Sequence, residues 1–103
     1  MVAQQKTLDV VLSQGTFRIV ERVERPLEMC VQFDSGMLCL ESAIDRPYDL
    51  GLREYAFKFS LKRRGQTAVT VYEFLPSDVG RSELRVRVLE DIRPVAQYRV
   101  TVK

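Results

Sequence analysis

The run 57-FKFSLK-62 decides the fold class of this 103-residue chain. Apolar and polar residues alternate at every step, with Phe57, Phe59 and Leu61 set against Lys58, Ser60 and Lys62. Successive side chains of a β-strand point to opposite faces, so a strand with one buried and one wet face produces this period of two. The run therefore predicts a strand in a sheet that has one wet face.

The same period recurs along the chain, in residues 8–12, 17–19, 84–88 and 98–102. Residues 67–75, TAVTVYEFL, are apolar on both faces and are predicted to form a more central strand. Turn-forming residues separate these runs, at positions 14–15, 24–26, 34–36, 64–65, 76–80 and 93–94.

Short strands at this spacing predict an all-β protein, namely an immunoglobulin-like antiparallel β-sandwich of about seven or eight strands. A small closed barrel is the alternative. Residues 1–103 are expected to form a single β-sandwich domain, because a chain of this length leaves no room for a second one. Residues 43–54 contain Pro and Gly and have little period, so they are predicted to form a long connection.

The charge pattern and the hydropathy argue against several classes of partner. The formal net charge is +2, and the basic residues are interleaved with acidic ones. Nucleic-acid binding instead favours a one-signed stripe that displaces counterions from phosphates. No apolar run approaches the roughly 18 residues of a membrane span, and the first residues lack the order of a signal peptide. We therefore expect no nucleic-acid partner, no membrane attachment and a cytoplasmic location.

Both cysteines lie in the stretch 28-EMCVQFDSGMLCLE-41. If this stretch is a hairpin with its loop centred between Asp34 and Ser35, Cys30 falls opposite Cys39 and the apolar residues share the other face. That register favours a disulfide between the two cysteines or two inert thiols. Redox and metal roles are less favoured, because a Cys-x-x-Cys pair and a set of four zinc ligands are both missing.

The chain lacks the residues of most catalytic sites. It has no histidine, and its five glycines are scattered singly, so neither an imidazole base nor a phosphate-binding loop is expected. Asp45 and Asp49 could form an acid/base pair, but carboxylates in such a loop are more often turn formers and salt-bridge partners. Arg85 and Arg87 are predicted to lie on a solvated sheet face. We expect a non-enzymatic protein with no catalytic residue, no cofactor and no metal.

The C-terminal half resembles the chagasin family of cysteine-protease inhibitors. The resemblance rests on the order 72-YEF-74, Gly80, residues 84–88, 92-IRPV-95 and residues 98–102, while 7-TLDVVLSQGTFRIV-20 is similar to the family's first two strands. The family's Asn-Pro-Thr-Thr-Gly loop has no counterpart, and Glu24-Arg25-Pro26 lies near its place. Val95 stands where the family has an aromatic residue, and the glycine-rich second loop is reduced to Arg64-Gly65.

Members of that family are immunoglobulin-like domains that plug papain-like active sites with three loops from one end. The resemblance implies the same fold and a cysteine protease as the partner. It also implies that the residues contacting the partner are Arg93, Pro94 and Val95, Arg64 and Gly65, and Arg25 and Pro26.

Two functional hypotheses follow from the residues. The first is a protein-binding module, because loops on a rigid sandwich commonly carry recognition. Its most specific version is a loop-mediated inhibitor of papain-like cysteine proteases. The second is a structural subunit that self-associates through a sheet face or an edge strand. A small-molecule carrier is a third alternative and would need an open barrel interior.

Overall fold

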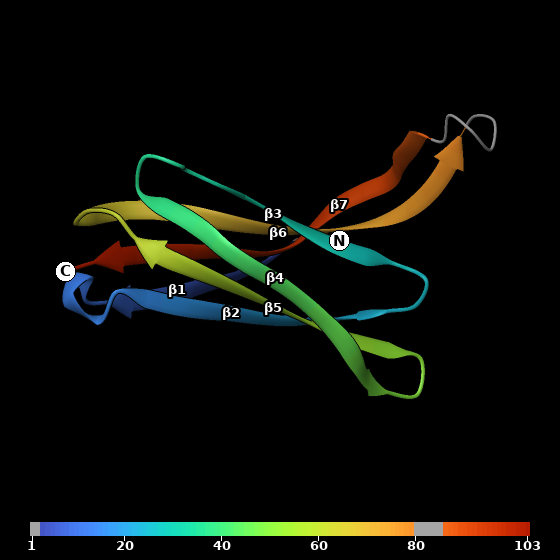
Figure 1. Ribbon diagram of the computed structural model, residues 1–103, viewed down its shortest axis with the longest axis horizontal. Coiled ribbons are helices and arrows are strands. Elements are labelled where there is room, and N and C mark those ends of the chain that lie inside the picture. Colours follow the sequence, from blue (N-terminus) through green and yellow to red (C-terminus); the bar gives the residue numbers. More distant parts are fainter. Residues whose placement is uncertain (1–2, 80–85) are drawn as a thin grey trace.

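The computed structural model describes residues 3–79 and 86–103, and strands make up most of them (Figure 1). The strands are β1 (Gln4–Val10), β2 (Thr16–Glu24), β3 (Glu28–Phe33), β4 (Leu38–Asp49), β5 (Leu52–Leu61), β6 (Gly65–Val79) and β7 (Val86–Val102). A short 3-10 turn, η1 (Leu12–Gln14), connects β1 to β2. In the described ranges no helix is long and apolar enough to cross a membrane.

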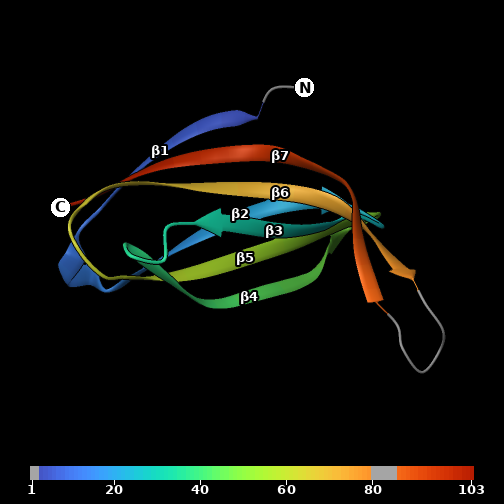
Figure 2. The ribbon, with the colours of Figure 1, turned by 90° about the horizontal axis from the view of Figure 1, so that it is seen from above.

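The strands form two sheets packed face to face (Figure 2). Sheet A has the order β1-β7-β6-β3, and sheet B has the order β2-β5-β4. These orders match the G-F-C and B-E-D sheets of the immunoglobulin fold, with the first strand placed beside the last. The predicted all-β, immunoglobulin-like sandwich is therefore confirmed. β1 runs parallel to β7, which departs from the antiparallel prediction, and the two sheets do not close into a barrel.

The core lies between the sheets and consists of the inward-facing half of each alternating pattern. The most deeply buried side chains are Ile19, Leu38, Phe57, Phe59, Val69, Val71 and Val100. The Phe59 ring stacks on Phe17 at 5.4 Å between centroids and meets the edge of Phe33 at 5.2 Å. β6 is flanked by β7 and β3, so the prediction of a central strand at residues 67–75 is confirmed.

The hairpin predicted for residues 28–41 is wrong. Cys30 lies on β3 and pairs with Tyr72 in sheet A, whereas Cys39 lies on β4 and pairs with Ser60 in sheet B. The turn after β3 crosses from one sheet to the other, so Met29 and Leu38 share the core across the sandwich and not across a hairpin. The two cysteines consequently face opposite outer surfaces, and both thiols are free.

Two free thiols of different reactivity are the expected result of a titration with a chromogenic disulfide reagent at pH 8. Cys39 is exposed and should react first. Burial raises the pKa of the Cys30 thiol, so less of it is thiolate at this pH and its reaction should be slower. Cys39→Ser should remove the fast phase alone. A native protein with no titratable thiol would contradict the topology.

Three predicted connections are parts of strands. Residues 43–49 belong to β4, which lies at the edge of sheet B and is exposed on both faces along this part, so no alternation marks it. β6 continues through Pro76, and β7 passes through Arg93 and Pro94. The turns predicted at 14–15, 24–26 and 34–36 are confirmed. The expected turn residue Gly80 and the residues 84–85 lie outside the described ranges.

Candidate functional site

Three connections meet at one end of the sandwich, on the right in Figure 1. They are the β2–β3 turn (residues 25–27), the β4–β5 turn (residues 50–51) and the β6–β7 hairpin beyond residue 74. We call this the loop end. The opposite end holds η1, the turn at 34–37 and the turn at 62–64, which hydrogen bonds from Leu61 to Gly15 and from Lys62 to Met37 tie together.

The β6–β7 hairpin bends across the loop end towards sheet B (Figure 2). Its ladder has two register shifts, one between Val71 and Tyr72 and one between Glu73 and Leu75. Such irregularities bend a strand and increase its twist. Pro94, which cannot donate a hydrogen bond to the ladder, lies at the first shift. The bend brings Pro76 of sheet A beside residues of sheet B.

The β4–β5 turn is held by hydrogen bonds on both sides of its tip. The Leu50 backbone N–H donates to Asp49 Oδ1 at 2.7 Å. Gly51 has φ of 75°, a left-handed conformation that glycine adopts without strain, and its carbonyl accepts from the Arg25 N–H at 2.9 Å. The last bond ties this turn to the β2–β3 turn. The two turns therefore form one braced unit.

A hollow of about 480 Å³ opens between the turns and the hairpin. It is lined by Arg25, Pro26, Glu28, Pro47, Arg53 and Pro76. Three of these residues are prolines, whose fixed φ limits motion of the walls. The loop end is thus a rigid concave surface beside the projecting tip of the β4–β5 turn.

Two ion pairs lie at the loop end. Arg53 forms an ion pair with Asp45, and Arg93 Nε donates to Glu73 Oε1 at 2.5 Å. Asp45 is therefore a salt-bridge partner and Asp49 a turn former. These are the structural roles that the sequence favoured over an acid/base pair for the two carboxylates. The end offers an apolar and mixed-charge surface suited to protein contact.

The structure brings together only part of the predicted contact residues. Arg25 and Pro26 form the β2–β3 turn, and Arg93 and Pro94 lie in β7 at the base of the hairpin. Val95 is half-buried and packs against the core. Arg64 and Gly65 lie at the opposite end, because β5 carries the chain along the whole length of the sandwich. The sequence left open whether the candidate loops share one end of the sandwich, and the structure separates Arg64 and Gly65 from the other two.

Sequence reasoning missed Leu50. Its side chain is 97% exposed at the tip of the β4–β5 turn. A single exposed leucine is common. This one, however, lies at the outermost point of the braced unit, where it makes no packing contact that would stabilise the free protein. The signal was the triplet Asp49-Leu50-Gly51, in which a turn former and a glycine enclose an apolar residue.

Elsewhere, a polar cluster joins the two sheets. Tyr98 Oη donates to Glu21 Oε1 at 2.5 Å, and Lys6 Nζ donates to the same oxygen at 2.9 Å. Burial, and then the bond to Glu21, raises the pKa of Tyr98 to about 12. The phenol therefore stays protonated at neutral pH and acts as a donor that links β7 to β2. Within residues 3–79 and 86–103, no cluster of His, Cys, Asp and Glu side chains could hold a metal ion.

Comparison with known proteins gives a likeness in structure and none in sequence. No protein-family model matches the chain, and no curated protein matches its sequence. The fold is similar to the crystal structure of EhICP2, a cysteine protease inhibitor from Entamoeba histolytica, with a TM-score of 0.62. The likeness covers 96% of this chain and 97% of that one, at 10% sequence identity. At this identity it shows the shared fold alone.

Proposed function

We propose that this chain is a protein-binding module whose loop end enters the active-site cleft of a papain-like cysteine protease and inhibits it. The observation that carries the proposal is Leu50, 97% exposed at the tip of a braced turn that shares its end of the sandwich with two other connections. Two likenesses support it: the fold shared with a cysteine protease inhibitor, and the sequence resemblance to the chagasin family.

Leu50 supplies the apolar anchor of the proposed contact. An apolar side chain that fills a pocket at the centre of an interface commonly carries much of the binding energy. The hydrogen bonds at Asp49 and Gly51 fix the backbone before binding, so little conformational entropy is lost on association. The same bonds oppose the extended conformation that places a peptide bond beside a catalytic nucleophile. The turn is therefore expected to be bound without being cut.

The flanking contacts come from the β2–β3 turn and from the hairpin. Arg25 and Pro26 stand beside Leu50 through the bond from Arg25 to Gly51. Arg93 and Pro94 lie at the base of the hairpin. In this proposal the β4–β5 turn takes the place that the sequence resemblance assigned to Arg64 and Gly65.

Blocking the active site tests where the protein binds. Papain whose catalytic cysteine is covalently capped by a small epoxide should lose binding to the immobilised protein, because the capping group occupies the space of the β4–β5 turn. Free papain should bind the wild type and an Arg64→Ala control equally, since Arg64 lies at the far end. Equal binding of capped and free papain would place the contact outside the active site and contradict the proposal.

A further inference from the structure

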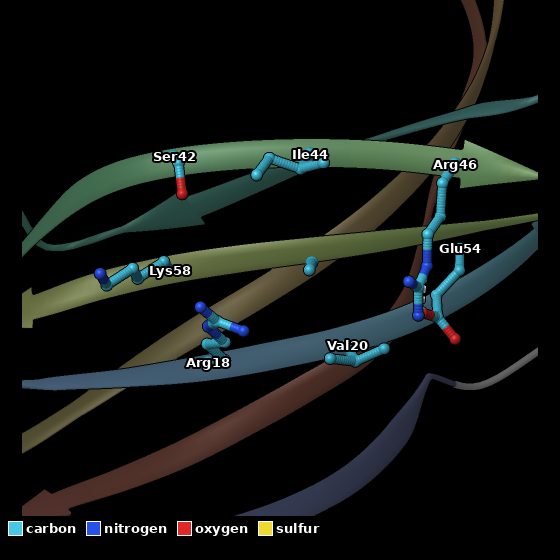
Figure 3. A pocket seen from close by; sticks show the side chains of 8 residues that line it. Arg18, Val20, Ser42, Ile44, Arg46, Glu54 and Lys58 are labelled. Carbon is cyan, nitrogen blue, oxygen red and sulfur yellow. Dashed lines mark hydrogen bonds and ion pairs between the residues drawn. The ribbon is translucent and has the colours of Figure 1, made fainter.

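The outer face of sheet B carries an apolar row at its centre (Figure 3). Val20, Ala56 and Ile44 are direct cross-strand neighbours on β2, β5 and β4. Val20 is 47% exposed and Ile44 is 61% exposed. The small side chain of Ala56 between them leaves a shallow hollow of about 260 Å³. This hollow can take one branched apolar side chain.

A cationic row lies on one side of the hollow. Arg18 and Lys58 are directly opposite each other in the β2–β5 ladder, and both line the hollow. Like charges at directly opposed positions destabilise a sheet. Among the described residues neither side chain has a hydrogen-bond or ion-pair partner. The pair thus carries an electrostatic cost that an anionic ligand would relieve.

The row on the other side of the hollow also carries a net positive charge, because it holds two arginines and one glutamate. Arg46 Nη2 donates to Glu54 Oε1 at 2.7 Å, and Arg22 Nε donates to Glu54 Oε2 at 3.3 Å. The bond from Arg46 lowers the pKa of Glu54, so this carboxylate stays ionised and neutralises one of the two guanidinium charges. The Arg22 guanidinium also stacks on the Tyr48 ring at 3.8 Å. Both arginines are therefore held in place, and one of their two positive charges is not neutralised by Glu54.

We propose that this face binds an acidic segment of a partner protein, with a branched apolar residue between two acidic ones. The apolar side chain fills the hollow over Ala56, one carboxylate pairs with Arg18 and Lys58, and the other pairs with Arg22 and Arg46. Neighbouring rows are two residues apart along a strand, about 6.6 Å. An extended peptide presents alternate side chains to one face at the same spacing. The expected motif is therefore acidic-x-apolar-x-acidic.

Charge complementarity favours this occupant over the alternatives. A second copy of the chain stacked on this face about a two-fold axis would bring the same four cations, Arg18, Arg22, Arg46 and Lys58, against each other. A nucleic-acid backbone offers phosphates for the cations but no branched apolar group for the hollow. The face is separate from the loop end, so the inference does not depend on protease inhibition.

The test is fluorescence anisotropy of a labelled peptide, Glu-Ser-Ile-Ser-Glu, with the full chain at low salt. Saturable binding is expected, and replacing the isoleucine of the peptide by serine should weaken it about tenfold. Arg18→Glu should also weaken binding about tenfold or more. The same substitution places opposite charges at the Lys58 pair, so it should raise Tm by about 2–5 °C. A loss of binding in a protein of higher Tm cannot come from misfolding.

The matched control is Arg99→Glu, an exposed arginine directly opposite Ala68 on the outer face of sheet A. This variant should bind the peptide as the wild type does. Four results would each overturn the proposal: no binding at about 1 mM peptide, equal loss in Arg99→Glu, competition by an oligonucleotide of equal charge as strong as by the peptide, or a dimer that Ile44→Asp dissociates.

Discussion

Leu50→Asp should weaken the inhibition of papain by about 100-fold or more, with the free energy of unfolding changed by less than about 0.5 kcal/mol. Leu50 is 97% exposed, so its replacement removes almost no packing from the free protein. In the proposed complex the same position is buried against the enzyme. An aspartate there loses the apolar contact and must also give up its hydration. Inhibition constants and urea denaturation of the same two proteins measure both effects.

Val11→Asp is the matched control for this substitution. Val11 is also an exposed apolar residue, but it lies beside η1 at the opposite end of the sandwich. Its replacement should leave the inhibition constant unchanged. If both variants lose inhibition to the same degree, the added negative charge and not the position is responsible. If Leu50→Asp inhibits as well as the wild type, the β4–β5 turn is not the anchor.

Phe59→Ala should lower the free energy of unfolding by about 3–5 kcal/mol. Phe59 is fully buried, and its ring contacts Phe17 of β2 and Phe33 of β3, so it joins the two sheets. Removing the ring loses the transfer free energy of its carbons and leaves a cavity that the sheets can close only in part. A large share of the stability of an ordinary small domain would be lost.

Urea denaturation gives the measurement, with Ile44→Ala as the control. Ile44 is an apolar residue on the outer face of sheet B, so its truncation should cost less than about 0.5 kcal/mol. A cost below about 1.5 kcal/mol for Phe59→Ala would show that the core is not centred on this ring.

The sequence predicts strands well where a sheet has one covered and one wet face. β5 shows its alternation because Phe57 and Phe59 face sheet A while Lys58 faces water. The part of β4 beyond residue 42 does not, because both of its faces are exposed and no burial selects one of them. Residues 43–54 were therefore predicted to form one long connection, and the turn that carries Leu50 was not recognised within it.

The pairing of strands is harder to read than their existence. Met29 and Leu38 are buried together, and a hairpin or a crossing between two sheets satisfies that pattern equally. Residues far apart in sequence decide between them, because β3 pairs with β6 and not with β4. The same lack of long-range information left open at which end of the sandwich Arg64 and Gly65 lie. The turn at Arg25 and Pro26 was predicted correctly because a proline turn is a local signal.

The measurement that tests the central claim most directly is a titration of papain activity with the purified wild-type protein. Enzyme concentration is held well above the expected dissociation constant. A linear fall in activity that reaches zero near one equivalent, and that does not recover over hours, is the predicted result, because the braced turn binds without being cleaved. Full activity in the presence of a large excess of folded protein would contradict the proposal that the loop end enters a papain-like active site.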